Sequence, residues 1–317
     1  MMLPSFVVPL GQGLYAIDTG FHRDHFDAAY LVVERGRAAF VDTGTNFSVP
    51  RLLQALQSLE LPLSAVDWVI PTHVHLDHAG GVGLLMQTLP EARLLVHPRG
   101  ARHMIDPSAL YQGALAVYGQ AEMDRAYGQL RSVAAERVVS SSDGMTVELA
   151  GRPLTLLDTP GHARHHHCIW DETTRGWFTG DTFGLSYREF DTAQGAWIMP
   201  TSTPVQFEPD ALADSVHRLM ARAPQAMYLT HYGRVQGVDR LAQTLLGLLD
   251  ATVRTAQALR DHPQRHEALE QALLEIYAQD LQRHGAPHSR EEIQRLLGLD
   301  IDLNAQGIAV WLDKTSC

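Results

Sequence analysis

The stretch 72–81 places four metal-binding side chains within six consecutive positions. It reads T-H-V-H-L-D-H-A-G-G, which places three imidazoles and one carboxylate at H-x-H-x-D-H spacing. Neutral imidazoles with carboxylates and no thiolates suit Zn, Fe, Mn or Co. Packing alone would rarely place these residue types together just before two glycines. We therefore predict that this cluster binds divalent metal through His73, His75, Asp77 and His78.

The elements around the cluster indicate how it is positioned. The apolar run 66–70 precedes it and predicts a buried strand, and G-G-V-G-L-L-M follows it and predicts the start of a helix. Strand-to-helix loops of this kind commonly carry functional residues. The same arrangement recurs three times. The apolar runs 154–157, 176–180 and 226–230 are each followed by a further candidate ligand, and these are His162, Asp181 and His231. Strand ends can converge on one edge of a sandwich, whereas a single loop cannot complete a coordination sphere.

These residues divide into two sets that one carboxylate can join. Three protein ligands per metal leave positions for water, unlike the closed sphere of a structural site. Two metals about 3.5–4 Å apart can lower the pKa of a shared water and polarise a carbonyl or phosphoryl oxygen. The sets are His73, His75 and His162 for one metal, Asp77, His78 and His231 for the other, with Asp181 as the bridge.

Taken together, the motifs resemble the metallo-β-lactamase-fold metallohydrolases. The matching segments are 72–81, 158–162, 179–182 and 230–231, with Asp42-Thr43-Gly44 matching the turn beneath the family's site. The resemblance covers roughly residues 5–235 and implies an α+β fold, a four-layer αβ/βα sandwich with a dinuclear site on one edge. It carries the family's ligand roles to His73, His75, Asp77, His78, His162, Asp181 and His231.

Within that family the chain resembles the glyoxalase II and lactonase-like branch, in which a carboxylate bridges the metals. The segment 161–166, G-H-A-R-H-H, departs from the usual G-H-T-P-G-H, although His166 stands at the last histidine position. We expect His166 to pack beside the ligands rather than bind metal. Residues that would recognise glutathione cannot be mapped on this chain, so the resemblance leaves the substrate open.

The composition changes near residue 235, after which leucines recur at helical spacing. Pro263 and Pro287 divide this region, which predicts several helices. We therefore expect a catalytic domain at 1–235 and a C-terminal helical appendage at 236–317. The appendage would support dimerisation or close one side of the pocket.

Charge and composition restrict the partners. The formal net charge of −11 disfavours nucleic acid, and no basic block offsets it. The two cysteines are far apart in sequence, the N-terminus has no basic signal region, and no apolar run reaches the roughly 20 residues of a membrane helix. We expect a cytoplasmic protein that acts on a small molecule and binds neither a membrane nor nucleic acid. A homodimer is a possible oligomeric state. Abundant arginine beside a single lysine favours a bacterial source.

We predict a dinuclear metal-dependent hydrolase in which a metal-bridging hydroxide attacks an ester, thioester or lactone carbonyl. Two divalent ions are expected, zinc first, with iron or manganese as alternatives. The other functions compatible with the same ligands are an iron-dependent redox or dioxygen enzyme, a phosphodiesterase, and a non-catalytic sensor.

Several residues near the ligands are candidates for supporting roles. Asp77 could accept a proton from the attacking water as well as bind metal. Tyr187, in the irregular segment 183–207, could donate to a substrate oxyanion, and that segment could form a lid or substrate wall. Asp42 and Asp158 are expected to orient imidazoles through hydrogen bonds. An early loop with Phe21, His22 and His25 is expected to overhang the site.

Overall fold

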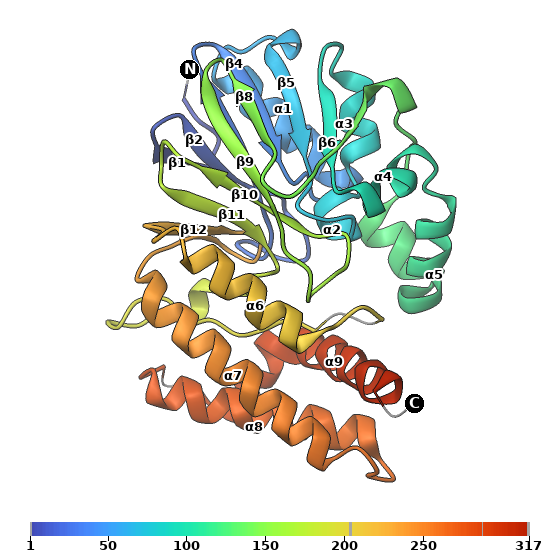
Figure 1. The fold of residues 1–317 in the computed structure, drawn as a ribbon, viewed down its shortest axis with the longest axis vertical. Coiled ribbons are helices and arrows are strands. Elements are labelled where there is room, and N and C mark those ends of the chain that lie inside the picture. Colours follow the sequence, from blue (N-terminus) through green and yellow to red (C-terminus); the bar gives the residue numbers. More distant parts are fainter. Residues whose placement is uncertain (1, 203–204, 287, 316–317) are drawn as a thin grey trace. The chain divides into compact units, whose positions relative to one another are not determined.

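The computed structural model describes residues 2–202, 205–286 and 288–315. Two mixed β-sheets dominate its N-terminal part (Figure 1). Along the first sheet the strands lie in the order β1 (Val7–Gly11), β2 (Leu14–Asp18), β3 (Ala28–Glu34), β4 (Arg37–Val41), β5 (Val66–Ile70), β6 (Arg93–Val96) and β7 (Val138–Ser140). The second sheet runs β13 (Gly233–Val235), β12 (Ala226–Leu229), β11 (Gly176–Gly180), β10 (His167–Asp171), β9 (Arg152–Asp158) and β8 (Thr146–Leu149).

The central strands of the first sheet are buried on both faces, which explains their nearly continuous apolar sequence. In β3, Ala29 and Leu31 enter one core and Tyr30 and Val32 enter the other, as the two-residue period of a strand requires. The second core also contains Leu154 and other residues of the second sheet, so it lies between the two sheets.

Helices cover the outer face of the first sheet. In α1 (Val49–Ser58), Leu52, Ala55 and Leu56 recur on one face and join the core formed with that sheet. The other helices of this part are α2 (Leu76–Ala79), α3 (Val82–Thr88), α4 (Pro98–Ile105) and α5 (Ser108–Glu122), and α5 is followed by the π-helical turn η3 (Met123–Tyr127).

The described chain forms two compact units. The first contains residues 1–158, 165–180 and 226–234, and the second contains 159–164, 181–225 and 235–317. The second unit includes α6 (Pro209–Met220), α7 (Val238–Ala258), α8 (Arg265–Arg283) and α9 (Arg290–Lys314), with the short 3-10 turn η5 (Arg188–Phe190) in the segment that precedes them. The domain boundary at 235 stays a prediction.

The expected αβ/βα sandwich is confirmed: two mixed sheets are flanked by helices, and α7, α8 and α9 form the C-terminal helical part. The predicted helices of the appendage correspond to these three, and Pro287, expected as a break, lies outside the described residues. Within the part of the chain that the structure describes, no helix is both long and apolar enough to cross a membrane.

A buried ion pair joins two neighbouring strands of the second sheet, and its arginine also bonds to the first sheet. Arg152 of β9 donates through Nε to Asp171 Oδ1 at 2.9 Å and through a terminal nitrogen to Oδ2 at 2.5 Å. Arg152 also donates to the carbonyl of Gln12 at 2.6 Å. Both charged side chains are almost fully buried. Removal of either one would leave the other charge in the interior without its hydrogen-bonded partner, since the next carboxylate to Arg152, that of Glu34, is 3.9 Å away.

We therefore expect Asp171→Ala to lower the free energy of unfolding by about 3–5 kcal/mol, the range for breaking a buried pair. Urea unfolding at neutral pH measures this loss. The exposed pair of Arg254 with Asp250 on α7 provides the control, and Asp250→Ala should change stability by under about 1 kcal/mol. Equal losses for the two variants would contradict the argument.

Candidate metal centre

The predicted ligands follow the ends of strands that run in the same direction. Strands β4 and β5 are parallel, and so are β11 and β12. Because β9 is antiparallel to β10 and β10 is antiparallel to β11, β9 also runs with β11. The Tyr30 hydroxyl donates to Leu229 O at 2.5 Å, which ties the end of β12 to the first sheet. The loops after β5 and β12 therefore meet at one edge of the sandwich.

The carboxylate of Asp42, which follows β4, connects these loops. It accepts hydrogen bonds from the backbone N–H of Thr72 at 2.7 Å, the hydroxyl of Thr72 at 3.0 Å and the hydroxyl of Thr230 at 2.7 Å. A fourth bond comes from Nδ1 of His78 at 2.9 Å. Four donors occupy the lone-pair sites of one carboxylate. Asp42 thus orients the imidazole of His78, whose role as a metal ligand stays a prediction.

These contacts determine which ring nitrogens face the centre. A carboxylate or carbonyl oxygen only accepts, so His78 carries its proton on Nδ1 toward Asp42. His231 likewise carries a proton on Nδ1, which lies 3.0 Å from Phe26 O. In both rings Nε2 is then the unprotonated nitrogen, as a metal ligand requires.

The two Nε2 atoms converge on the carboxylate of Asp77. Its Oδ2 lies 3.4 Å from Nε2 of His231 and 3.7 Å from Nε2 of His78. Donors bound at about 2.0–2.2 Å in a tetrahedral site lie roughly 3.3–3.6 Å from one another. Three electron-pair donors at this spacing repel one another unless a cation lies between them. The residues thus fit a divalent metal, and Asp77, His78 and His231 form one donor group in the first unit.

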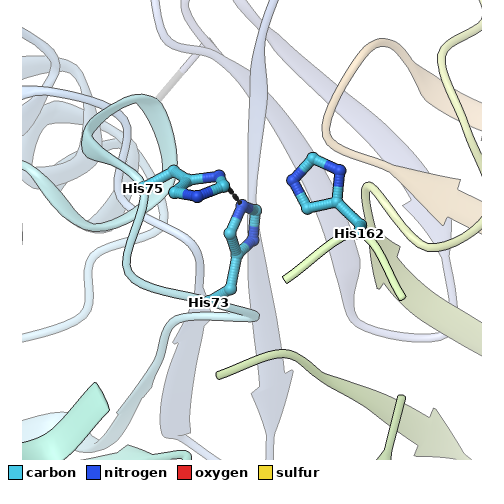
Figure 2. A group of neighbouring side chains, drawn as sticks. All are labelled: His73, His75 and His162. Carbon is cyan, nitrogen blue, oxygen red and sulfur yellow. Dashed lines mark hydrogen bonds between the residues drawn. The ribbon is translucent and has the colours of Figure 1, made fainter. Parts of the chain in front are cut away.

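The remaining predicted ligands lie in both units. In the first, Nε2 of His73 lies 2.7 Å from Nδ1 of His75 (Figure 2). In the second, Nε2 of His162 lies 3.3 Å from Oδ2 of Asp181. Figure 2 draws His162 together with the first pair. The first pair joins residues two positions apart in the sequence, and the second joins residues 19 positions apart. The complete seven-residue ligand set stays a prediction.

Two further histidines, His165 and His166, pack against predicted ligands of the first unit. The His166 ring stacks on His73 with centroids 4.8 Å apart, and Nδ1 of His165 accepts from the backbone N–H of Val74 at 3.4 Å. Burial lowers the pKa of His165 to about 2.

A side chain at Gly180, whose φ is +45°, would meet both Thr72 and His166 at under 3 Å, so this position admits only glycine.

Other candidates named from the sequence lie in different surroundings. The Tyr187 ring is buried, and its hydroxyl donates to Asp300 at 3.1 Å in the second unit. Its catalytic role stays a prediction. The described part of segment 183–207 is also tied to the C-terminal helices, since Trp197 donates to Asp280 and Ser202 N–H donates to Asn304. Residues 203–204 of that segment lie outside the described part.

Asp158 orients an imidazole, but not a predicted ligand. It accepts from Nε2 of His97 at 3.1 Å, while Nδ1 of His97 caps α4 by accepting from Arg99 N–H. In the early loop, His22 and His25 both have left-handed backbone angles, with φ of 54° and 56°. Their expected role above the site stays a prediction.

Sequence reasoning did not identify Thr72 and Thr230 as partners of Asp42. Each threonine directly precedes a predicted histidine ligand, and that repeated T-H pair was the available signal.

Comparison with known proteins agrees with this geometry. The family model described as the metallo-beta-lactamase superfamily matches residues 11–227. The chain belongs to this superfamily. A metallo-beta-lactamase fold-containing protein of Sulfurisphaera tokodaii is 27% identical over 229 residues, which cover 71% of this chain and 80% of that protein. A solved metallo-beta-lactamase family protein from Thermus thermophilus has a TM-score of 0.68 at 20% identity, covering 97% of this chain and 95% of that one.

More distant relatives include proteins with named activities. An acyl-coenzyme A thioesterase of Homo sapiens is 28% identical over 190 residues, which cover 54% of this chain and 64% of that protein. A hydroxyacylglutathione hydrolase of Salmonella typhi is 28% identical over 152 residues, which cover 48% of this chain and 45% of that protein. The chain is thus a superfamily member whose distant relatives include thioester hydrolases.

We expect Asp42→Asn to weaken zinc binding about 10- to 100-fold, the usual effect of removing a group that orients metal ligands. The amide nitrogen cannot accept, so at least one donor of the network loses its partner. Competition with a chromophoric chelator measures the affinity, and circular dichroism of the metal-free variant verifies that it is folded.

Asp158→Asn is the matched control, because this carboxylate holds the imidazole of His97 instead of a predicted ligand. It should leave zinc affinity within about twofold. Equal weakening in both variants would contradict the role assigned to Asp42.

A second prediction concerns acid stability. Burial lowers the pKa of His167 to about 3, and its ring contacts Ser141 and Pro71 O. In the unfolded chain the pKa of the His167 side chain is near 6.5. Between about pH 6.5 and 3 this side chain therefore binds a proton in the unfolded state but not in the folded state. Stability should be complete above pH 6.5 and fall with decreasing pH by up to about 1.4 kcal/mol per unit from this residue.

His167→Gln should therefore have a shallower pH dependence of unfolding free energy in that window. Chelator-treated protein and urea titrations at several pH values measure both slopes. The exposed residue His217 provides the control through His217→Gln, which should keep the wild-type slope. An unchanged slope in His167→Gln would show that the acid sensitivity comes from other groups.

Proposed function

We propose that this protein is a dinuclear metal-dependent hydrolase of esters, thioesters or lactones, with zinc as the first choice of metal. The observation that carries the proposal is the convergence of Nε2 of His78, Nε2 of His231 and Oδ2 of Asp77, three donors at metal-ligand spacing. Three protein ligands leave open positions, which favours catalysis over a closed structural site.

Chain connectivity supports the participation of the two ligands from the second unit. Asp181 directly follows Gly180, the last residue of β11, and consecutive Cα atoms are about 3.8 Å apart. His162 lies in the short stretch 159–164, whose neighbours in the chain on both sides belong to the first unit. We therefore propose that His73, His75 and His162 hold one metal, that Asp77, His78 and His231 hold the other, and that Asp181 joins them.

When bound, such a metal pair lowers the pKa of a water molecule and polarises a carbonyl oxygen. The residues of this chain hold and orient the reacting groups. Asp42 holds the ring of His78, and Phe26 O holds the ring of His231, so both Nε2 atoms stay aimed at the centre. Asp77, whose side chain is about one quarter exposed, is placed to accept a proton at its second oxygen.

The substrate class is proposed from chemistry and from the distant relatives. The net charge of −11 disfavours a polyanionic nucleic acid. The human relative is named an acyl-coenzyme A thioesterase and the Salmonella relative a hydroxyacylglutathione hydrolase, both of which act on thioesters by name. A cytoplasmic location and a homodimer remain part of the proposal.

The first experiment pairs metal content per chain with a substrate panel of thioesters, lactones, β-lactams and phosphodiesters. We expect two metals per chain and hydrolysis of thioesters or lactones. Asp181→Ala should retain about one metal and lose at least about 100-fold in kcat/KM, because a metal pair contributes several kcal/mol of charge stabilisation.

Asp250→Ala, an exposed substitution on α7, is the control and should match the wild type in both assays. One metal or none in the wild type, or turnover that does not change in Asp181→Ala, would contradict the dinuclear proposal.

A further inference from the structure

The backbone that leads into the loop of predicted ligands is held by one buried histidine. His167, the first residue of β10, donates through its backbone N–H to Thr72 O at 2.9 Å, and its ring Nε2 lies 3.0 Å from Pro71 O. A carbonyl oxygen only accepts, so the ring carries its proton on Nε2 and donates it to Pro71 O. His167 thus binds both of the carbonyl groups that directly precede the predicted ligand His73.

A serine fixes the state of that ring. Nδ1 of His167 lies 2.8 Å from Ser141 Oγ. Because the ring proton is on Nε2, Nδ1 accepts and the Ser141 hydroxyl donates. Burial lowers the pKa of His167 to about 3, so the ring stays neutral at the pH values at which imidazoles bind zinc. Ser141, His167 and Pro71 O therefore form one hydrogen-bonded series, in which both ring nitrogens are used and neither is left to bind metal.

Asp42 holds the remaining polar groups of Thr72. The N–H and the hydroxyl of Thr72 donate to Asp42, while its carbonyl accepts from His167. Since the hydroxyl proton of Thr72 points to Asp42, its Oγ accepts from Nδ1 of His73 at 3.2 Å. His73 then has its proton on Nδ1, and Nε2 is the unprotonated nitrogen that a metal requires. This Nε2 is the atom that faces His75 in Figure 2.

We propose that His167, oriented by Ser141, is a positioning residue for the metal ligand His73. The role rests on the proposed function, in which His73 binds metal. Thr72 is held through its N–H and hydroxyl on one side and through its carbonyl on the other, so the peptide that carries His73 cannot rotate without breaking one of these bonds. A side chain without a donor at position 167 would leave the carbonyl before Thr72 unpaired and loosen the aim of His73.

The neighbouring imidazole of His97 provides the matched comparison. His97 and His167 line the same cavity of about 90 Å³ and have ring centroids 6.3 Å apart. His97 is also buried, and burial lowers its pKa as well. Its partners, however, are Asp158 and the N–H of Arg99, and neither belongs to the loop of predicted ligands. Loss of either ring alters the same cavity, but only loss of His167 removes a donor to that loop.

The test compares His167→Leu, which removes the ring donor and keeps the backbone N–H, with His167→Gln, whose side-chain amide can donate to Pro71 O. Competition with a chromophoric chelator measures zinc affinity of the full-length protein without substrate. His167→Leu should weaken binding of one zinc ion about tenfold, the lower end of the range for groups that orient ligands. His167→Gln should restore the affinity to within about threefold, because it supplies the missing donor. His97→Leu should stay within about twofold of the wild type.

The absorption spectrum of the cobalt(II)-loaded protein is a second readout, which a purely structural role would not change. The visible bands of cobalt(II) depend on the geometry of its ligands. His167→Leu should alter these bands, whereas His167→Gln and His97→Leu should keep those of the wild type. If His167→Leu lowers only the free energy of unfolding, with zinc affinity and cobalt spectrum unchanged in the folded protein, the positioning role is overturned.

Ser141→Ala decides the question if His167→Leu does not fold, because it keeps the ring and removes only the hydroxyl that orients it. It should weaken the same zinc ion about threefold, the effect of one lost hydrogen bond. The double variant with His167→Leu should lose no more affinity than His167→Leu alone, since Ser141 acts through the ring. Unchanged affinity in Ser141→Ala, or additive losses in the double variant, would overturn the proposed series.

These metal measurements need no turnover, so they separate the positioning role from the proposed function. If the wild type binds zinc but hydrolyses no thioester or lactone, and His167→Leu weakens zinc, the hydrolase proposal fails and the positioning role stands. Hydrolysis with two zinc ions bound, but with equal zinc affinity in His167→Leu, overturns the positioning role alone. A wild type that binds no zinc overturns both.

Discussion

The hydrogen-bonded carboxylate of Asp42 is the constraint on which the candidate centre depends. It fastens the ends of β4, β5 and β12, which belong to two different sheets, through Thr72, Thr230 and His78. Asp42 itself has a left-handed backbone angle, with φ of 57°. Such a conformation costs on the order of 1 kcal/mol or more for a residue with a side chain, and four hydrogen bonds to a charged acceptor offset that cost.

Imidazoles can be buried together only when they are neutral. An imidazolium inside the sandwich would be poorly solvated, and burial indeed lowers the pKa of His165 and His167 far below its ordinary value. Neutral rings can then pack, stack and accept hydrogen bonds, as His166 does on His73 and His165 does from Val74. Neutral imidazole is also the form that binds metal, so burial and ligation favour the same protonation state.

The sequence predicted the parts of this structure that depend on local pattern. The strand Val66–Ile70 and the helices of the C-terminal part were expected from apolar spacing, and the H-x-H-x-D-H loop from its composition. Strand β10 was missed, because its first residue His167 continues a run of histidines read as motif. Helix α6, which follows the irregular segment 183–207, was also missed. The partner of Asp158 could not be predicted either, since His97 lies 61 residues away and only the packing of the two sheets brings them together.

The residues that hold the predicted ligands are firmly determined by the structure. Asp42 cannot change without leaving buried donors unpaired, and Gly180 cannot accept a side chain because Thr72 and His166 occupy the space. Substitutions outside this hydrogen-bonded network leave the framework of the predicted ligands intact, which is how one fold can carry many specificities.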